Sequence, residues 1–245
     1  MVKLKQKEKT NMKKLLISIV ALLTAVSVVK AADVADINVE AGYNNYYAVN
    51  GVAYATDVPY AGIGAVKSLK YADVYVGGLL LADGNQDQSH WTVGLGKSVS
   101  LWKDFAVRVD GNVIRHQTVS SGIPNSTEFG VKLAVQNPYV TPYVRGAFNI
   151  ELNQNAYFVG AERAQKLPFG LVLTPAVEWG TSTSYQAINA KGTLTRPITF
   201  AWGTVTPFAE VGWFNNGVFD VAEKVYAVSR FDNTVVYNAG LRLSF

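Results

Sequence analysis

The chain ends on NAGLRLSF, residues Asn238–Phe245, an alternating stretch whose last residue is aromatic. Chain termini usually fray and carry polar residues, so an aromatic residue at the final position needs a structural reason. Counting back from it, every second residue lies on one apolar face: Val235, Tyr237, Ala239, Leu241, Leu243 and Phe245. The residues between them form a polar face. This period of two predicts a β-strand that runs to the last residue.

The same alternation continues back through the chain to Ile37 and predicts an all-β fold. Turn signals such as Asp83-Gly84-Asn85 and Asn215-Asn216-Gly217 separate the alternating segments. We count about twelve strands, near residues 37–47, 52–67, 71–82, 89–100, 105–115, 127–136, 140–152, 156–165, 170–181, 187–196, 203–214 and 233–245. Three of them (52–67, 71–82 and 187–196) alternate poorly, so ten or fourteen strands are the alternatives.

Both a soluble β-sandwich and a transmembrane β-barrel use this pattern, and the contents of the two faces separate them. A sandwich packs its bulky apolar faces inward against each other. Here the other face is rich in Gly, Ala, Ser, Thr and isolated charges, which suits the wet lumen of a barrel. Aromatic residues lie near the segment ends, as in the interfacial girdles of membrane barrels: Tyr43, Trp91, Phe105, Tyr157, Trp179 and Trp213.

An internal repeat indicates consecutive up-and-down hairpins. Three segments share a Thr-Pro pair, namely VTPYVRG (140–146), LTPAVEWG (173–180) and VTPFAEVG (205–212). Proline cannot donate to a central strand ladder and is tolerated near strand starts. We therefore expect Pro142, Pro175 and Pro207 at the periplasmic rim of the barrel. Convergent turn chemistry is the alternative explanation of the repeat.

The N-terminal region has the marks of a secretory signal peptide. Lys13 and Lys14 precede a short apolar run, which ends in small residues before an acidic segment. We expect residues 1–31 to be cleaved after Ala31, with Ala32 as the alternative, and residues 32–245 to form one barrel domain. An uncleaved helical anchor is the other reading, although the apolar run is short for a membrane span.

Removing this segment changes the charge of the chain. It holds seven of the 22 basic residues and one of the 18 acidic residues, which leaves 15 against 17 and a net charge of −2. The mature chain therefore offers no case for nucleic-acid binding. The absence of cysteine excludes a disulfide framework and cysteine metal sites.

The C-terminal strand resembles that of the Gram-negative bacterial outer-membrane β-barrel superfamily, in particular its small porin-like members. In that family a polar residue is followed two positions later by Gly, and apolar residues occupy the antepenultimate and terminal positions. Asn238, Gly240, Leu243 and Phe245 match this pattern. The resemblance implies that these four residues are read by the barrel-assembly machinery. It also implies an outer-membrane location among lipid and lipopolysaccharide, with no cofactor or metal.

A transmembrane sheet has to close, because lipid offers no partners to edge N–H and C=O groups. The first strand must then pair with the last, which predicts that Glu40 and Arg242 are neighbours at the seam. A solvated pair of this kind contributes little energy. On the same face we expect a pore lining of Glu40, Arg108, Asp110, Glu128, Lys132, Arg145, Glu151, Glu162, Glu178, Lys191, Glu210 and Arg242.

This set has seven acids and five bases, which predicts a weak preference for cations. The alternative is that the charges pair across the lumen and fill a narrow barrel. Eight strands leave no open interior and sixteen leave a channel, so twelve favours a narrow pore. The longest connections, 116–126 and 215–232, lie on the predicted outer side.

His90 and His116 are the two histidines of the chain, and both fall on the inward phase of strands that flank the turn at 101–104. We expect them to lie nearly opposite each other near the outer rim. With Asp87 nearby they offer a metal site or an acid–base pair, but no nucleophile motif or metal-ligand spacing supports either. We therefore expect two rim histidines in a polar girdle and no catalytic residues.

The favoured hypothesis is a monomeric outer-membrane channel for passive diffusion of small hydrophilic solutes. A non-conducting surface barrel, used in adhesion, envelope integrity or as a receptor, is the second hypothesis. A barrel enzyme is the third.

Overall fold

A computed structural model describes residues 35–49, 52–82, 88–118, 125–151, 153–182, 186–215 and 234–245 of the chain. The expected signal peptide, its cleavage site and most of the two longest connections lie outside these residues. Among the described residues, no helix has the length and apolar character needed to cross a membrane.

All twelve predicted strand segments are confirmed, including the three that alternate poorly. The barrel strands are β1 (Asp36–Val49), β2 (Val52–Ser68), β3 (Asp73–Leu81), β4 (Gln88–Trp102), β5 (Phe105–Thr118), β6 (Ser126–Gln136), β7 (Thr141–Asn149), β8 (Gln154–Glu162), β10 (Val172–Ser182), β11 (Gln186–Thr195), β13 (Gly203–Asn215) and β14 (Thr234–Ser244). The apolar–polar alternation is weak in β2 and β3 because small residues, such as Gly62 and Gly77, occupy inward positions. Backbone pairing with the strands on both sides holds β2 and β3 in the sheet, although their side chains give little pattern.

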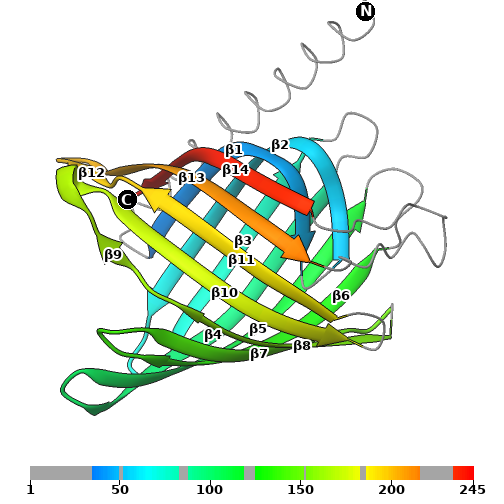
Figure 1. The fold of residues 1–245 in the computed structure, drawn as a ribbon, viewed down its shortest axis with the longest axis horizontal. Coiled ribbons are helices and arrows are strands. Elements are labelled where there is room, and N and C mark those ends of the chain that lie inside the picture. Colours follow the sequence, from blue (N-terminus) through cyan, green and yellow to red (C-terminus); the bar gives the residue numbers. More distant parts are fainter. Residues whose placement is uncertain are drawn as a thin grey trace, which may run out of the picture.

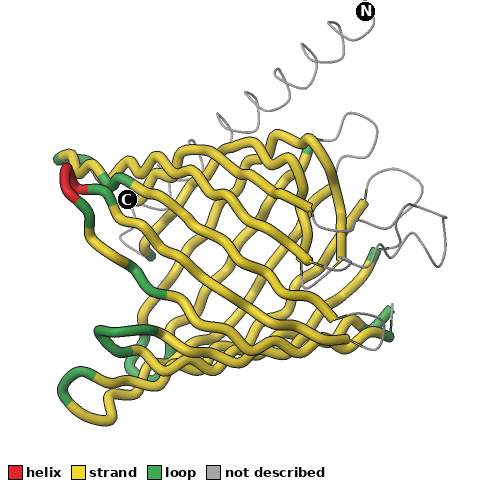
Figure 2. The backbone as a smooth tube through the Cα atoms, in the orientation of Figure 1, coloured by secondary structure: helices red, strands yellow, loops and turns green. Residues whose placement is uncertain are grey.

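The twelve strands form one closed antiparallel sheet (Figure 1). Each strand pairs with the next along the chain, and β1 pairs with β14, so every barrel strand has two partners. We call the end that carries Phe245 and the turns 69–72, 103–104 and 137–140 the inner rim, and the opposite end the outer rim. Figure 2 shows the strands crossing the barrel obliquely between these two rims.

Two short strands extend the inner rim beyond the ring. β9 (Gln165–Lys166) pairs with the start of β10, and β12 (Ile198–Phe200) pairs with the start of β13. A one-turn 3₁₀ helix, η1 (Pro168–Gly170), joins β9 to β10, with Phe169 in the left-handed region and largely exposed. The three repeated prolines are the second, fourth and fifth residues of β7, β10 and β13, and so lie towards this rim.

The outward phase of the strands forms an apolar belt. Val76, Val93, Val131, Val177 and Leu241, from five different strands, are each exposed. Aromatic side chains mark its edges, with Trp91, Tyr157, Trp179 and Trp213 near the outer rim and Trp102, Tyr139 and Trp202 near the inner rim. This distribution is that of a barrel surface in contact with lipid.

The seam between β1 and β14 has the predicted register, with Glu40 directly opposite Arg242. The guanidinium Nε of Arg242 donates to a carboxylate oxygen of Glu40 at 2.8 Å. The terminal residue completes this seam: the N–H of Phe245 donates to the carbonyl of Ile37 at 2.9 Å. Its ring packs with the apolar cluster of Ile37, Val39 and Leu243.

We predict that the seam is sensitive to a single methyl group at Gly240. A Cβ at this position would meet the backbone of Ala41 and Gly42 on the neighbouring strand. Gly240→Ala should therefore lower the free energy of unfolding by about 1–3 kcal/mol through overpacking. Urea unfolding of the refolded chain in detergent micelles measures this change.

Gly64→Ala is the matched control, because a Cβ there would make only an ordinary contact at 3.7 Å with the carbonyl oxygen of Val76. Equal unfolding midpoints for the two variants would contradict a tightly packed seam.

Candidate functional site

The barrel register carries one face of every strand into the lumen. Starting from Glu40, the paired positions run through Gly62, Leu79, His90 and His116 without a change of phase. Eleven of the twelve predicted lining residues share this inward phase: Glu40, Arg108, Asp110, Glu128, Lys132, Arg145, Glu162, Glu178, Lys191, Glu210 and Arg242. That they line a conducting pore stays a prediction.

Glu151 does not belong to this set. It lies in the turn between β7 and β8, where strand alternation no longer sets side-chain direction. Its carboxylate pairs with Arg115 at 2.8 Å and accepts from the N–H of Thr127 at 2.6 Å, and both partners are on the outward phase. Burial raises the pKa of Glu151, but the hydrogen bonds from Thr127 and Arg115 outweigh it, so the pKa lies below its ordinary value.

Asp73 takes the place of Glu151 in the lumenal charge balance. It is the first residue of β3, a segment whose poor alternation hid it in the sequence, and it faces Gly96 on the inward phase. Arg108 lies between Asp73, at 3.2 Å, and Asp110, at 2.8 Å. This sector of the wall, over β3 to β5, therefore holds one cation and two carboxylates.

On the other side of the barrel, three cations are each matched by one carboxylate. Arg145 forms a bidentate pair with Glu178, with both N–O distances at 2.8 Å. The remaining two pairs are Lys191 with Glu210 at 3.1 Å and Lys132 with Glu162 at 3.8 Å. Every one of these pairs joins strands that are adjacent or separated by one strand. Among the described residues the lumenal ion pairs thus run along the wall, not across the lumen.

Aromatic rings on the inward phase contact three of the lumenal cations, namely Arg145, Lys132 and Arg242. The guanidinium of Arg145 lies 3.6 Å above the ring of Phe158, and the ammonium of Lys132 lies 4.2 Å above Tyr143. At the seam, Arg242 lies 5.7 Å from the ring of Phe208. A cation held between a carboxylate and an aromatic face is both neutralised and immobilised.

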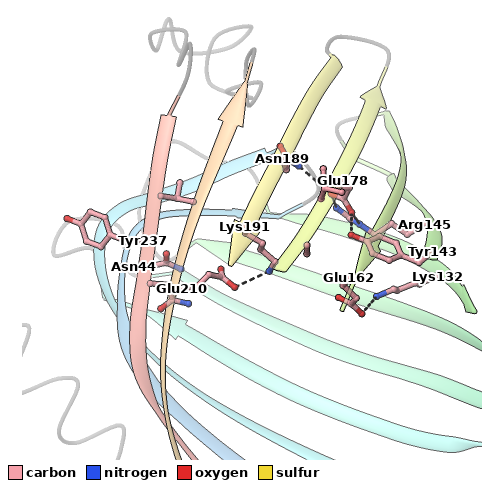
Figure 3. Close-up of a pocket in the computed structure, with 14 residues that line it drawn as sticks. Asn44, Lys132, Tyr143, Arg145, Glu162, Glu178, Asn189, Lys191, Glu210 and Tyr237 are labelled. Atoms are coloured by element: carbon pink, nitrogen blue, oxygen red, sulfur yellow. Dashed lines mark hydrogen bonds and ion pairs between the residues drawn. The ribbon is translucent and has the colours of Figure 1, made fainter. Parts of the chain in front are cut away.

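A cavity of about 470 Å³ lies between these side chains (Figure 3). Residues from eight consecutive strands of the ring line it, from β6 through β14 to β1. The three ion pairs line it together with Tyr143, Asn44, Asn189 and Asn238. Tyr143 donates its hydroxyl to Glu178 at 3.0 Å, and the side-chain N–H of Asn189 reaches the same carboxylate at 3.4 Å.

The inward aromatic residues are the part of the site that sequence reasoning missed. Tyr60, Tyr143, Phe158 and Phe208 face the lumen, whereas large apolar residues were assigned to lipid. The signal was present in the spacing, because Tyr143 stands two residues before Arg145 and hence on the same face. The hydroxyl of Tyr60 links the seam to this cluster, 2.9 Å from Glu40 and 3.1 Å from Asn238.

The two histidines are direct partners in the β4–β5 ladder, as the sequence predicts. Their Nδ1 atoms lie 2.5 Å apart, and the side chains are 4% and 1% exposed. They belong to a buried polar belt below the outer rim, formed with Gln88, Ser126, Glu128 and Asn149. Within the described part of the chain, no group of three or more His, Cys, Asp and Glu side chains has the arrangement of a metal site.

Comparison with known proteins gives no sequence-based relative: no known protein-family profile matches the chain, and neither does any curated protein sequence. Solved structures do match. The KdgM porin superposes with a TM-score of 0.53 at 9% identity, over 85% of this chain and 99% of the porin. The chain has the fold of outer-membrane β-barrels.

Two further structures agree in fold. The KdgM porin in complex with disordered oligogalacturonate has a TM-score of 0.52 at 10% identity, over 86% of this chain and 99% of its own. Outer membrane phospholipase A from Escherichia coli has a TM-score of 0.51 at 10% identity, over 84% and 92%. Since this group includes both a porin and a phospholipase, the fold by itself does not select a function.

We predict unequal coupling in two of the lumenal ion pairs. Arg145 and Glu178 form a bidentate pair with side chains 26% and 11% exposed, whereas Lys132 and Glu162 are 3.8 Å apart and 36% and 38% exposed. Double-mutant cycles to Met and Gln, followed by urea unfolding, should give about 1–3 kcal/mol for the first pair. The second should give less than about 1 kcal/mol, because solvent screens it. Equal coupling energies would contradict the difference in burial.

Proposed function

We propose that the chain is a narrow outer-membrane channel that passes small hydrophilic solutes by diffusion. One observation carries the proposal: the lumenal ion pairs lie along the wall, beside a cavity of about 470 Å³. Twelve strands lie between the eight that side chains fill and the sixteen that enclose a wide channel. The likeness of fold to the KdgM porin supports the same function.

The location and assembly of the channel are part of this proposal. Export through residues 1–31 into the envelope of a Gram-negative bacterium, with lipid and lipopolysaccharide around a monomeric barrel, agrees with the exposed apolar belt. Asn238, Gly240, Leu243 and Phe245 would present the final strand to the barrel-assembly machinery. In the folded barrel, Asn238 accepts a hydrogen bond from the hydroxyl of Tyr60, and Leu243 and Phe245 pack in the apolar cluster at the seam.

Single-channel recording of refolded residues 32–245 in a planar bilayer tests the proposal. We expect discrete conductance steps. Under a salt gradient we expect a reversal potential whose sign indicates a weak preference for cations, since acids outnumber bases on the lumenal phase. Part of the excess acid belongs to the sector around Arg108, where two carboxylates face one cation.

The Asp73→Asn/Asp110→Asn variant should therefore move the reversal potential towards zero. Glu151→Gln, at the outer rim and outside the lumenal phase, is the control and should leave the potential unchanged. A heat-resistant folded barrel that inserts but never conducts would overturn the channel and favour a non-conducting surface barrel.

The buried histidines are the observation that favours an enzyme as the alternative function. His116 lies opposite Ser126 in the β5–β6 ladder, and the hydroxyl of Ser126 accepts a hydrogen bond from Asn149 at 3.1 Å. Three side-chain types used in hydrolysis therefore lie together. Each of these side chains is less than 5% exposed, which leaves a substrate little access to them, and this is why we favour the channel.

The rival is tested with a His90→Ala/His116→Ala variant that retains the folded barrel. We expect its ester-hydrolysis rate to equal that of the unmodified chain, at background level. A rate above background that the variant abolishes would favour the enzyme.

A further inference from the structure

We propose that the cavity bounded by the pairs Lys132–Glu162, Arg145–Glu178 and Lys191–Glu210 is a subsite for uncharged polyhydroxyl solutes, such as sugars and polyols, that discriminates against anions. We call it the neutral cavity. The inference rests on the proposed channel function and adds to it the class of solute.

The charges that line the neutral cavity balance one another. The neutral cavity is lined by three cations and three carboxylates, each cation within 3.8 Å of its own carboxylate. Part of the excess acid of the lumen belongs to another sector of the wall, around Arg108. A solute in the neutral cavity therefore meets no net field that would concentrate ions of one sign.

Two of the three cations, Arg145 and Lys132, are held between partners of their own, which restricts their access to a solute anion. The carboxylate of Glu178 takes both donors of a bidentate fork from Arg145, and the ring of Phe158 covers a face of that guanidinium. Lys132 lies between Glu162 and the ring of Tyr143. An entering anion would have to separate these groups and leave a half-buried carboxylate without its partner, which is costly.

The neutral cavity also offers hydrogen-bond acceptors to a solute that carries hydrogen-bond donors. The side-chain oxygen of Asn189 is buried and has no hydrogen-bond partner among the described residues. Glu162 lies 3.8 Å from Lys132, beyond hydrogen-bond distance, so its carboxylate keeps capacity to accept. The hydroxyl of Tyr143 donates to Glu178 and keeps its own lone pairs.

Hydroxyl groups fit this arrangement, because each one both donates and accepts while carrying no charge. A polyhydroxyl solute can donate to Asn189 and Glu162 without breaking an ion pair. The volume of about 470 Å³ lies within the range of about 300–1,000 Å³ that is usual for small-molecule sites.

The experiment is swelling of proteoliposomes that contain refolded residues 32–245, with glucose and gluconate as probes of similar size. We expect glucose to enter faster than gluconate. If neither probe enters liposomes that contain folded barrel, the channel function itself fails. If both enter at the same rate, the channel stands and the neutral cavity is overturned.

Variants assign the discrimination to these residues. Glu162→Gln/Glu178→Gln/Glu210→Gln leaves three uncompensated cations, and gluconate entry relative to glucose should rise about tenfold. Glu162→Gln alone, at the most exposed and longest pair, is the variant to use if the triple change fails to fold, and it should move the ratio in the same direction. Glu151→Gln is the matched control with an unchanged ratio. An unchanged ratio in a folded Glu162→Gln barrel would overturn the assignment.

Asn189→Leu tests the acceptor side directly. Glucose that occupies the neutral cavity should reduce the single-channel current of the unmodified chain in a concentration-dependent way. Loss of the Asn189 oxygen should weaken this block at least severalfold, with the block of each protein expressed relative to its own conductance without glucose. Block of equal strength in the two proteins would contradict the role of Asn189.

Discussion

The structure depends on one constraint: a sheet in lipid must give every backbone N–H and C=O group a partner. The pairing of β1 with β14 meets it, because these are the two strands that would otherwise present open edges. Gly240 and Gly42 let the two backbones approach, and the last residue of the chain pairs with Ile37. Phe245 is thus part of the closure, and Glu40 and Arg242 face each other in the same ladder.

Closure also determines the character of the lumen. Once the ring has twelve strands, the inward side chains of β6 to β8 and of β10 to β14 surround one space, and charged groups there must find partners near at hand. They find them on adjacent strands or one strand further, with Tyr143 and Phe158 filling the gaps between the cations. Because these ion pairs form along the wall and not across the lumen, the space beside them stays open as the neutral cavity. This is the physical link between the fold and the proposed passage of uncharged solutes.

The outer and inner ends of the barrel differ in structure and in the burial of their side chains. The inner rim has short turns, extended by the β9 and β12 hairpins, and its aromatic residues are exposed. Below the outer rim, the inward side chains from Gln88 to Asn149 form a belt that is polar yet buried. The inward side chains on this side of the lumen are thus buried below the outer rim, whereas the neutral cavity lies at the level of Glu178 and Lys191.

The period of two in the sequence determined the strands, their two faces and the barrel, because side-chain direction in a strand follows from local backbone geometry alone. It also placed Glu40 opposite Arg242 and His90 opposite His116, where closure or a short turn fixes the register. It was wrong for Glu151, since alternation ends where the strand gives way to a turn, and it omitted Asp73 and the inward aromatic rings. Which cation meets which carboxylate was decided only by the tertiary structure. Arg145 and Glu178 are 33 residues apart, and their contact depends on the register of two ladders and on the curvature of the closed sheet.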